Sequence, residues 1–435
     1  MIRRIVLGLI AALVVIVAGL AIYLAVAPPE LLRVGDGYAA KIVCSNVFLA
    51  GRNPQEVLNT DVQAPGNPLL RLVGVTVDRS AGTVTAKILG FVAPQVAIAR
   101  PGHGCTLVPD GRLDHVAALP PALPQATGGA AWAEAPDAAI ARLIADPTLA
   151  GPGARAIVVA RGGRIVAERY AGGFDARTPL LGWSMAKTVN AMLIGTLMLK
   201  GSIGLDDAGL FPQWTDARKD IRLRDLAAMT GGLAFNEEYG DVSDVNRMLF
   251  LEPDMAGFAA SQPSVARPGT VFSYSTGTAT MLARLWMDRV GADAANYPRQ
   301  ALFAPIGADS AVIEADEAGT LVGSSYMYAT ARDWARIGQL LAQDGVWNGL
   351  RLLPEGFVKL MQTPNGLPGG YSQMQTWLEP DSGLPEGSFW LDGHDGQSIA
   401  VIPSAQLVIV RLGLTPSDLG YSAIPLAKAV LAASQ

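Results

Sequence analysis

The longest apolar segment of the chain lies near its N-terminus. Residues 5–27 carry no charged side chain, while Arg3 and Arg4 precede them and Glu30 is the first charge that follows. As a helix these 23 residues span about 34 Å, enough to cross a hydrocarbon core of about 30 Å. We therefore expect residues 1–28 to form a cytoplasmic stub and a single-pass signal anchor, with Arg3 and Arg4 on the cytoplasmic side.

A cleaved signal peptide is the alternative, because Ala25-Val26-Ala27 has the small-x-small form of a cleavage site. The apolar run is longer than the usual core of a signal peptide, and cleavage after Ala27 would leave Pro28 at the new N-terminus. Both readings export the rest of the chain. The anchor places the protein in the inner (cytoplasmic) membrane, with its body on the periplasmic or extracellular side.

Short alternating segments with turns between them follow the anchor. Four strands are expected in a small β-rich module over residues 29–108, at residues 41–49, 72–78, 83–91 and 95–99. Residues 109–136 contain five prolines among Ala and Gly, which is the composition of a semi-rigid linker.

The pattern over residues 137–435 changes between strands and helices. Two hairpins are expected, one over residues 156–160 and 164–170 and the other over residues 398–402 and 406–412. Helical spacing separates them, and it is clearest at residues 184–200 and 332–343. With a final helix at about 422–433, this order predicts an α+β domain whose antiparallel sheet is split in sequence around a helical subdomain.

Composition and charge exclude several functions. Half of the residues are hydrophobic and 16% are charged, which excludes wholesale disorder. The net charge of −5 leaves no basic excess for nucleic acid. The chain has three histidines and neither an H-E-x-x-H nor a C-x-x-C motif, so we expect no metal site and no cofactor.

The two cysteines, Cys44 and Cys105, permit one disulfide in an exported chain. Closing a loop of about 60 residues would stabilise the fold by roughly 4 kcal/mol in the chain-entropy model. Two buried free thiols are the alternative.

A nucleophile and a base stand together at the start of the helix over residues 184–200. Ser184-Met185-Ala186-Lys187 places Ser184 and Lys187 on one helix face. Serine needs a base to remove its proton, and burial together with the positive end of the helix dipole lowers the pKa of a lysine. Alone, the four-residue pattern more often marks a serine cap with a surface lysine.

Two later segments add candidate chemistry. Tyr274-Ser275-Thr276 follows a turn, and its tyrosine is suited to relay a proton to a leaving group. Gly393-His394-Asp395-Gly396-Gln397 leads into a strand, where a glycine-rich edge brings backbone N–H groups close to a substrate.

In their order, these segments resemble the motifs of the penicillin-recognising serine hydrolases, S-x-x-K, Y-x-N and K-T-G. The family includes class C β-lactamases, D,D-peptidases, related esterases and 6-aminohexanoate-dimer hydrolases, and the resemblance covers about residues 150–435. It implies a β-lactamase/transpeptidase-like fold. It also implies that Ser184 is the nucleophile, Lys187 the base and Tyr274 the proton relay.

This chain departs from the family pattern at two motifs. Thr276 replaces the asparagine of the second motif, and only Gly396 of the third motif matches, with His394 in place of the lysine that helps hold a β-lactam carboxylate. This favours the esterase and amidase branch over efficient β-lactam hydrolysis. The resemblance further implies an oxyanion hole made by the backbone N–H groups of Ser184 and Gln397.

Further substrate contacts are less specific. We place His394, Gly396 and Thr276 in the substrate pocket. Trp183 either lines the pocket or packs in the core. The loop Glu237-Glu238-Tyr239-Gly240 either borders the pocket, with Tyr239 as a contact, or is simply solvated.

The sequence therefore predicts a membrane-anchored, exported serine hydrolase that cleaves a small-molecule or peptide-like amide or ester through an acyl-enzyme on Ser184. A β-lactamase or D,D-peptidase acting on cell-wall peptides is one alternative, and a non-catalytic penicillin-binding-like envelope protein is another. A third is an α/β-hydrolase scheme in which His394 is the base for Ser184.

Overall fold

The protein divides into two compact units. The computed structural model describes residues 2–64, 66–124 and 132–434. The N-terminal unit comprises Met1–Ala99, Cys105–His115 and Glu238–Pro253, and the C-terminal unit comprises Arg100–Gly104, Val116–Glu237 and Asp254–Gln435. The segment 238–253, expected to lie in the hydrolase domain, thus groups with the N-terminal unit.

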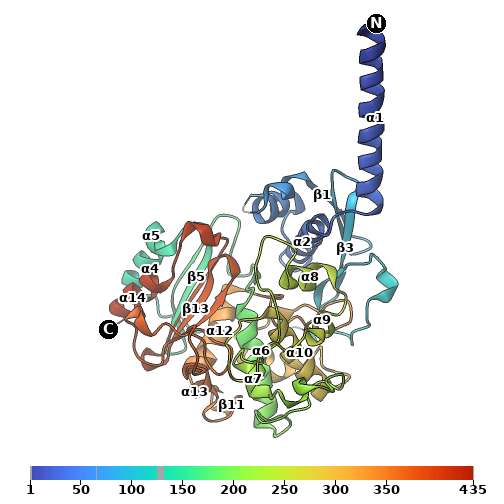
Figure 1. The fold of residues 1–435 in the computed structure, drawn as a ribbon. Helices are drawn as coiled ribbons and strands as arrows, with labels where there is room; N and C mark the ends of the chain where they lie inside the picture. Colours follow the sequence, from blue (N-terminus) through green and yellow to red (C-terminus); the bar gives the residue numbers. More distant parts are fainter. Residues whose placement is uncertain (1, 65, 125–131, 435) are drawn as a thin grey trace. The chain divides into compact units, whose positions relative to one another are not determined.

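The first element of the N-terminal unit is the long apolar helix α1 (Ile2–Val26), drawn in dark blue in Figure 1. None of its residues is buried, and its mean hydropathy reaches 3.1 over an 18-residue window. By length and composition α1 fits either a single-pass anchor or a signal sequence.

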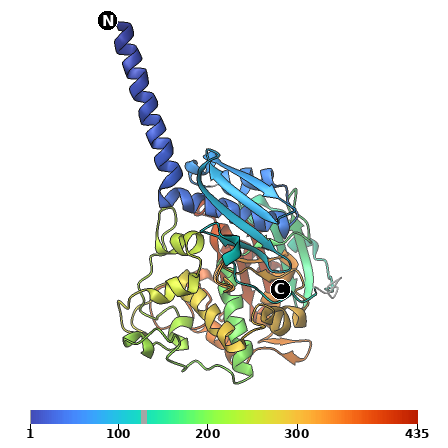
Figure 2. The same cartoon turned by 90° about the vertical axis from the view of Figure 1, so that its right-hand side faces the viewer.

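A four-stranded antiparallel sheet in the order β1-β2-β3-β4 packs against α2 (Glu30–Phe48) in this unit (Figure 2). The strands are β1 (Val73–Asp78), β2 (Thr83–Ile88), β3 (Val92–Arg100) and β4 (Gly104–Val108). The remaining helices of the unit are α3 (Pro54–Val57), a π-helix (Leu58–Gln63), 3-10 helices (Pro68–Leu72 and Leu113–His115) and α8 (Asp244–Leu251).

The strand expected at residues 41–49 is wrong, because these residues lie in and just after α2. Ala39, Val43 and Val47 recur every four residues and are at most 2% exposed, which is the spacing of a helix face. The helix also contacts α8, which comes from a segment two hundred residues later in the chain. The β-branched residues favoured a strand locally, and packing on both sides of α2 overrides that preference.

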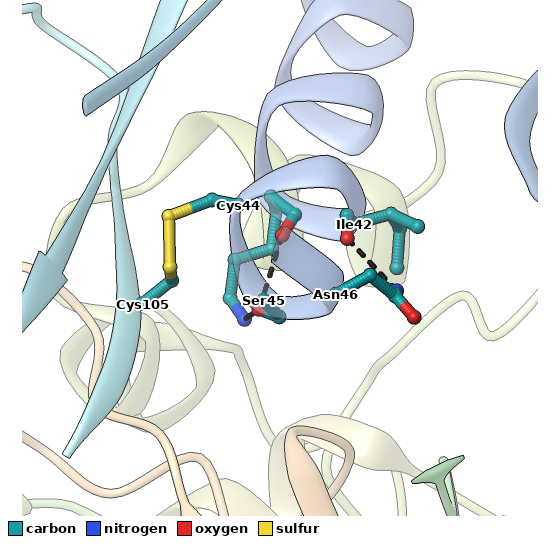
Figure 3. Close-up of a disulfide and its surroundings, with 6 residues drawn as sticks. Ile42, Cys44, Ser45, Asn46 and Cys105 are labelled. Atoms are coloured by element: carbon teal, nitrogen blue, oxygen red, sulfur yellow. Dashed lines mark hydrogen bonds between the residues drawn. A yellow bond between two sulfur atoms is a disulfide. The ribbon is translucent and has the colours of Figure 1, made fainter. Parts of the chain in front are cut away.

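A disulfide joins α2 to β4. Cys44 and Cys105 are bonded, with both side chains fully buried (Figure 3). The helix around Cys44 is also held by side chains that bond back one turn, since Ser45 Oγ donates to Lys41 O (3.1 Å) and Asn46 Nδ2 donates to Ile42 O (2.9 Å). The bridge therefore links the first helix after α1 to the last strand of the sheet.

The predicted linker over residues 109–136 includes the boundary between the units, at His115 and Val116. Its described part after the boundary is fastened to the C-terminal unit: Ala117 N donates to Glu317 O (2.9 Å), and Asn296 Nδ2 donates to Pro121 O (3.0 Å). Residues 125–131 of the predicted linker lie outside the described residues.

The C-terminal unit is built on a five-stranded antiparallel sheet in the order β12-β13-β14-β5-β6. Its strands are β5 (Ala154–Arg161), β6 (Arg164–Tyr170), β12 (Phe389–Gly393), β13 (Gln397–Ile402) and β14 (Leu407–Gly413). β14 pairs with β5, with Val410 opposite Val158, so one sheet joins hairpins that are far apart in the sequence. The expected α+β fold with a split antiparallel sheet is confirmed.

Helices cover both faces of this sheet. On one face α4 (Ala138–Ala145), α5 (Pro147–Ala150) and α14 (Ile424–Ala433) enclose a buried apolar cluster with the strands. On the other face lie α6 (Met185–Leu199) and α12 (Ala331–Ala342), in green and orange in Figure 1. Ser184 and Lys187 lie at the start of α6, on this second face, and the third motif lies in the turn between β12 and β13.

The remaining elements of the C-terminal unit are short, apart from α10. The helices are α7 (Leu223–Ala227), α9 (Met255–Ser261), α10 (Thr276–Val290), α11 (Ala304–Ile306) and α13 (Phe357–Gln362). The short strands are β7 (Leu180–Leu181), β8 (Val312–Ile313), β9 (Met327–Ala329), β10 (Val346–Trp347) and β11 (Leu350–Arg351). A π-helix (Arg299–Phe303) and 3-10 turns complete the unit.

Candidate active site

Ser184 stands at the start of α6, at the end of a sharp turn. Gly182 N donates to Met327 O (2.9 Å), which ties the chain to β9 immediately before the turn. Trp183 then adopts a left-handed backbone with φ 49°, and α6 begins at Met185. Such a conformation is costly for a bulky residue, and it aims the half-buried Ser184 side chain from the first turn of the helix.

Lys187 meets Ser184 one turn further along α6. Its Nζ donates to Ser184 Oγ at 2.9 Å, to Thr276 Oγ1 at 3.1 Å and to the carbonyl oxygen of Ser324 at 3.0 Å. Its side chain is 1% exposed. The alternative of a surface lysine beside a serine cap is therefore wrong, and the three acceptors match the three protons of a lysine ammonium.

The protonation of Lys187 is finely balanced. Burial lowers the pKa of Lys187 to about 8, because the charged form loses its hydration, and the negative charge of Glu237 acts in the opposite direction. At pH 7 about a tenth of the lysine is then unprotonated, and this fraction increases as pH rises through 8. Such a lysine has a lone pair directed at the Ser184 hydroxyl.

Thr276 links Lys187 to Glu237. Its hydroxyl accepts from Lys187 Nζ and donates to Glu237 Oε1, while its backbone N–H donates to Glu237 Oε2 (2.8 Å). Thr276 is fully buried at the first position of α10, where Ser275 caps the helix by accepting from Thr278 N (3.0 Å). Thr276 is therefore a bridge between the lysine and a carboxylate.

Tyr274 lies against Lys187 within an aromatic cluster. The lysine Nζ is 4.9 Å from the centroid of the Tyr274 ring, a distance typical of a cation–π contact. Trp377 and Tyr371 pack on the same ring at centroid distances of 5.1 and 5.7 Å. The ring of Tyr274, the predicted proton relay, thus lies beside Lys187, the predicted base.

The third motif approaches the serine turn from β12. A Cβ at Gly393 would collide with the carbonyl oxygen of Gly182, so only glycine permits this approach. The exposed His394 ring packs edge-on against Trp183 at 5.9 Å between centroids. His394 is therefore brought next to the residue that precedes Ser184, as a pocket-edge role requires.

Gln397 holds the turn that carries the third motif. Its side chain donates to Gly413 O (2.6 Å) and accepts from Gly413 N (2.8 Å), which fastens the start of β13 to β14. It also donates to His394 O (3.1 Å) across the 3-10 turn of Gly396. Gln397 thus supports this edge with its side chain, and the oxyanion role of its backbone N–H stays a prediction.

Tyr239 belongs to the N-terminal unit, and its side chain is 49% exposed. Its predicted substrate contact therefore stays a prediction. Among the described residues, no motif residue belongs to a cluster of three potential metal ligands.

Sequence reasoning missed the partners that surround Lys187. It placed Glu237 in a loop near the pocket but did not pair it with Thr276, and it did not identify Ser324, Tyr371 or Trp377. These residues come from loops and carry no local motif, so only their positions in the fold reveal them.

Comparisons with known proteins point to one family. The model of the family described as Beta-lactamase matches residues 140–419, more than half of the chain. A 6-aminohexanoate-dimer hydrolase of Paenarthrobacter ureafaciens is 25% identical over 295 residues, which cover 60% of this chain and 72% of that protein.

Solved structures show the same fold. A Bacillus anthracis structure described as a 6-aminohexanoate-dimer hydrolase superposes with a TM-score of 0.59 at 23% identity, covering 69% of this chain and 87% of that one. A family VIII carboxylesterase superposes with a TM-score of 0.52 at 17% identity, covering 68% and 96%. A family model that spans both hairpins and all three motifs decides the assignment: the chain belongs to the beta-lactamase family and is a hydrolase with the beta-lactamase fold.

Proposed function

We propose that the protein is a serine hydrolase that cleaves amide or ester bonds through an acyl-enzyme on Ser184. The observation that carries this proposal is the 2.9 Å contact between Ser184 Oγ and the buried Lys187 Nζ, together with the pKa of about 8 for that lysine. A buried lysine near its pKa is a competent base for a serine hydroxyl.

The reaction follows from these positions. Ser184 Oγ attacks the substrate carbonyl carbon as its proton moves to the neutral Lys187 Nζ. The negative oxygen that develops is stabilised by the backbone N–H groups of Ser184 and Gln397. Tyr274 gives its hydroxyl proton to the leaving nitrogen or oxygen and regains one from Lys187. Water then attacks the acyl-enzyme, with the same residues moving the protons in reverse.

The substrate class is argued from the third motif and from the relatives. His394 supplies no fixed cation at the place of the family's lysine, so a β-lactam carboxylate has a weaker partner here. The similarity to a 6-aminohexanoate-dimer hydrolase and to a carboxylesterase supports a linear amide or ester instead. A β-lactamase or D,D-peptidase is the second candidate, favoured by likeness to a Bacillus halodurans penicillin-binding protein (TM-score 0.51, 16% identity, covering 68% of this chain and 99% of that one).

The same proposal includes anchoring and export. We take α1 as an uncleaved single-pass anchor in the cytoplasmic membrane, and place both units on the periplasmic or extracellular side. The support is the uncharged length of α1 and the arginines Arg3 and Arg4 before it.

The test uses the full chain in detergent and a fluorophosphonate probe that traps activated serines. We expect the wild type to be labelled at Ser184 and to hydrolyse the 6-aminohexanoate dimer or short-chain esters faster than a chromogenic cephalosporin. Ser184→Ala should abolish labelling and turnover. Lys187→Arg is the matched control for charge and burial, and it should be nearly as inactive because arginine stays protonated.

Three outcomes would contradict parts of this proposal. Labelling of Ser184 in Lys187→Arg at the wild-type rate would remove Lys187 as the base. An unlabelled wild-type serine would favour a non-catalytic envelope protein. Loss of labelling in His394→Asn as complete as in Ser184→Ala would make His394 the base.

A further inference from the structure

One end of the sheet in the N-terminal unit carries four exposed apolar side chains. Leu69, Leu72, Leu89 and Phe91 are 41%, 46%, 56% and 47% exposed, and we call them the apolar tip. Outside α1, the described residues include eleven large apolar side chains with exposure of this order, and the other seven are scattered along the chain. Scattered exposed apolar residues are normal in soluble proteins, whereas a group at one place indicates a contact.

The backbone brings these four residues together. β1 and β2 pair with Val73 opposite Ile88, and the next step of the ladder is the bond from Leu89 N to Leu72 O (3.0 Å). Leu69 lies three residues before Leu72 in a 3-10 helix, and this spacing puts both side chains on one side of that helix. Phe91 is in the same turn as Leu89, since Phe91 N donates to Ile88 O (3.2 Å).

The turn at the apolar tip carries a residue that is unfavourable in an exposed, left-handed position. Leu89 and the following Gly90 both have left-handed backbones, with φ of 51° and 80°. Hairpin turns of this kind favour asparagine or glycine at the first position, and a left-handed leucine is strained there because its Cβ crowds the following carbonyl oxygen. The turn is therefore strained and also exposes an apolar side chain. Both features are unfavourable in water, and contact of the side chain with an apolar medium would compensate for them.

The apolar tip lies close to the point where α1 ends. Only Ala27, Pro28 and Pro29 separate α1 from α2. Residues 35 and 36 of α2 meet the tip region: Leu70 lies against Gly35, and Asp36 Oδ2 accepts from Ile88 N (3.0 Å). This contact is about 8 Å along the helix from Glu30, at 1.5 Å per residue. Both views show the sheet beside the foot of α1 (Figures 1 and 2).

Basic side chains flank the apolar tip. Arg71 lies between Leu69 and Leu72, and Lys87 lies two residues before Leu89; both are exposed. Apolar side chains with lysine or arginine beside them are the composition of surfaces that lie in the headgroup region of a bilayer. Burying a leucine or phenylalanine there removes apolar surface from water, which is favourable and opposes the strain of the turn.

We propose that the apolar tip inserts into the surface of the membrane that holds α1, as a second contact beside the anchor. This inference rests on the proposed function of α1 as an uncleaved anchor. It gives the N-terminal unit a role of its own, which is to fix the orientation of the protein at the lipid surface.

The test is nitroxide labelling of the full chain in vesicles of phosphatidylethanolamine and phosphatidylglycerol. The two native cysteines are bonded and buried, so single cysteines can be introduced and labelled selectively. The positions are Phe91→Cys and Leu72→Cys in the apolar tip, Leu13→Cys in α1, and Leu113→Cys as the matched control. Leu113 is in the same unit and is 42% exposed, similar to Phe91. The measurement is the accessibility of each label to oxygen, which concentrates in lipid, relative to a water-soluble nickel complex.

We expect the ratio of oxygen to nickel accessibility at positions 91 and 72 to be severalfold higher than at position 113 and to approach that at position 13. If the label at position 91 is exposed to water while the label at position 13 is exposed to lipid, the inference is wrong but α1 is still an anchor. If the labels at both positions are exposed to water, the proposal that α1 is an anchor is wrong as well. A label at 91 shielded from both reagents would mean that protein covers the apolar tip, which also contradicts the inference.

A second variant separates membrane contact from folding. Asparagine tolerates the left-handed backbone at position 89, so Leu89→Asn should leave the thermal midpoint unchanged or higher. In the same variant the accessibility ratio of a label at position 91 should fall severalfold. A clear drop in thermal midpoint would instead mean that Leu89 packs within the protein, which would contradict the inference.

Discussion

Left-handed backbones gather around Ser184, although few non-glycine residues adopt them. Trp183 precedes Ser184 and Asp395 lies within the third motif, with φ of 49° and 59°. Met229, with φ 58°, packs in the aromatic cluster of Tyr371, and Gln375, with φ 55°, accepts from Thr188 of α6 through its carbonyl oxygen (2.7 Å). The backbone strain at each such residue lowers the stability of the fold by on the order of 1–3 kcal/mol. This part of the fold is therefore less stable than it could be, and the strain fixes the positions of its side chains.

Glu237 should control the pH at which the enzyme works. Its negative charge raises the pKa of Lys187, which must lose a proton to act as a base, so activity should increase as pH rises through about 8. Glu237→Gln removes the charge and keeps the shape, and the acid limb of the kcat/KM profile should move to lower pH. The plateau should fall by no more than about tenfold, because the reacting residues remain.

The control for this variant is Glu238→Gln, a neighbouring carboxylate with no assigned place in the site. If the acid limb of the kcat/KM profile lies at the same pH in Glu237→Gln and in the wild type, the bridge through Thr276 does not set the protonation state of Lys187. This holds whatever the height of the plateau.

His394 should influence binding more than chemistry. Its ring packs on Trp183, whereas Lys187 Nζ is the group that contacts Ser184 Oγ, so His394→Asn should raise KM severalfold and leave the rate of Ser184 acylation nearly unchanged. Stopped-flow acylation with an ester substrate separates the two quantities. A fall in the acylation rate with KM unchanged would assign His394 to the chemical step instead.

The sequence predicted the local part of the site and missed the non-local part. Ser184 and Lys187 are three residues apart on one helix, and such a pair can be read from spacing. Thr276 and Glu237 are 39 residues apart, and their bonds depend on how a loop meets the start of α10. Thr276 was identified as a substitute for asparagine, but its role as a bridge required the fold.

At the scale of elements, the hairpins were predictable and α2 was not. The strands of the large sheet alternate or are continuously apolar between clear turns, so local pattern and final structure agree. In α2 the local preference of Ile42, Val43 and Val47 for strands opposes the packing. The helix forms because α8 and the small sheet bury its two sides.

Within α2, Asp36 should make the N-terminal unit less stable as pH rises. It is fully buried, and burial raises the pKa of Asp36 to about 7 from an ordinary value of 3.8, although Ile88 N donates to it. The folded state therefore holds a proton that the unfolded state releases between about pH 4 and 7. The stability from this proton is complete below pH 4 and is lost as pH rises through 7.

Asp36→Asn should remove this pH dependence. At pH 8 it should raise the free energy of unfolding by on the order of a few kcal/mol, and with it the thermal midpoint, whereas at pH 4 both should change little. Differential scanning calorimetry of the full chain at both pH values measures it. Asp78→Asn is the opposite control, because hydrogen bonds from Ser80 and Ala81 lower the pKa of Asp78. A wild-type midpoint that rises from pH 5 to pH 8 in the N-terminal transition would contradict the role of Asp36.

For the whole molecule, α1 and the arginines before it predict a fixed orientation. Protease added to intact spheroplasts should digest both units, and the chain extracted from untreated membranes should keep its full mass of 45.4 kDa. Replacing Arg3 and Arg4 with glutamate is the control, since it should weaken the orientation signal. Full protection of the wild type would place the body in the cytoplasm, and a product beginning at Pro28 would show that α1 is removed.

The grouping of residues 238–253 with the N-terminal unit means that the two units are interleaved along the chain rather than arranged in series. The ribosome completes the helix α2, the small sheet and the partners of the disulfide long before it makes α8, which packs on α2. During synthesis one side of α2 therefore stays uncovered until the ribosome has made α8, which follows Ser184 in the chain. No single cut in the chain can release either unit intact, so gene fusions or truncations that treat residues 1–115 as a free-standing domain will expose a core face to solvent.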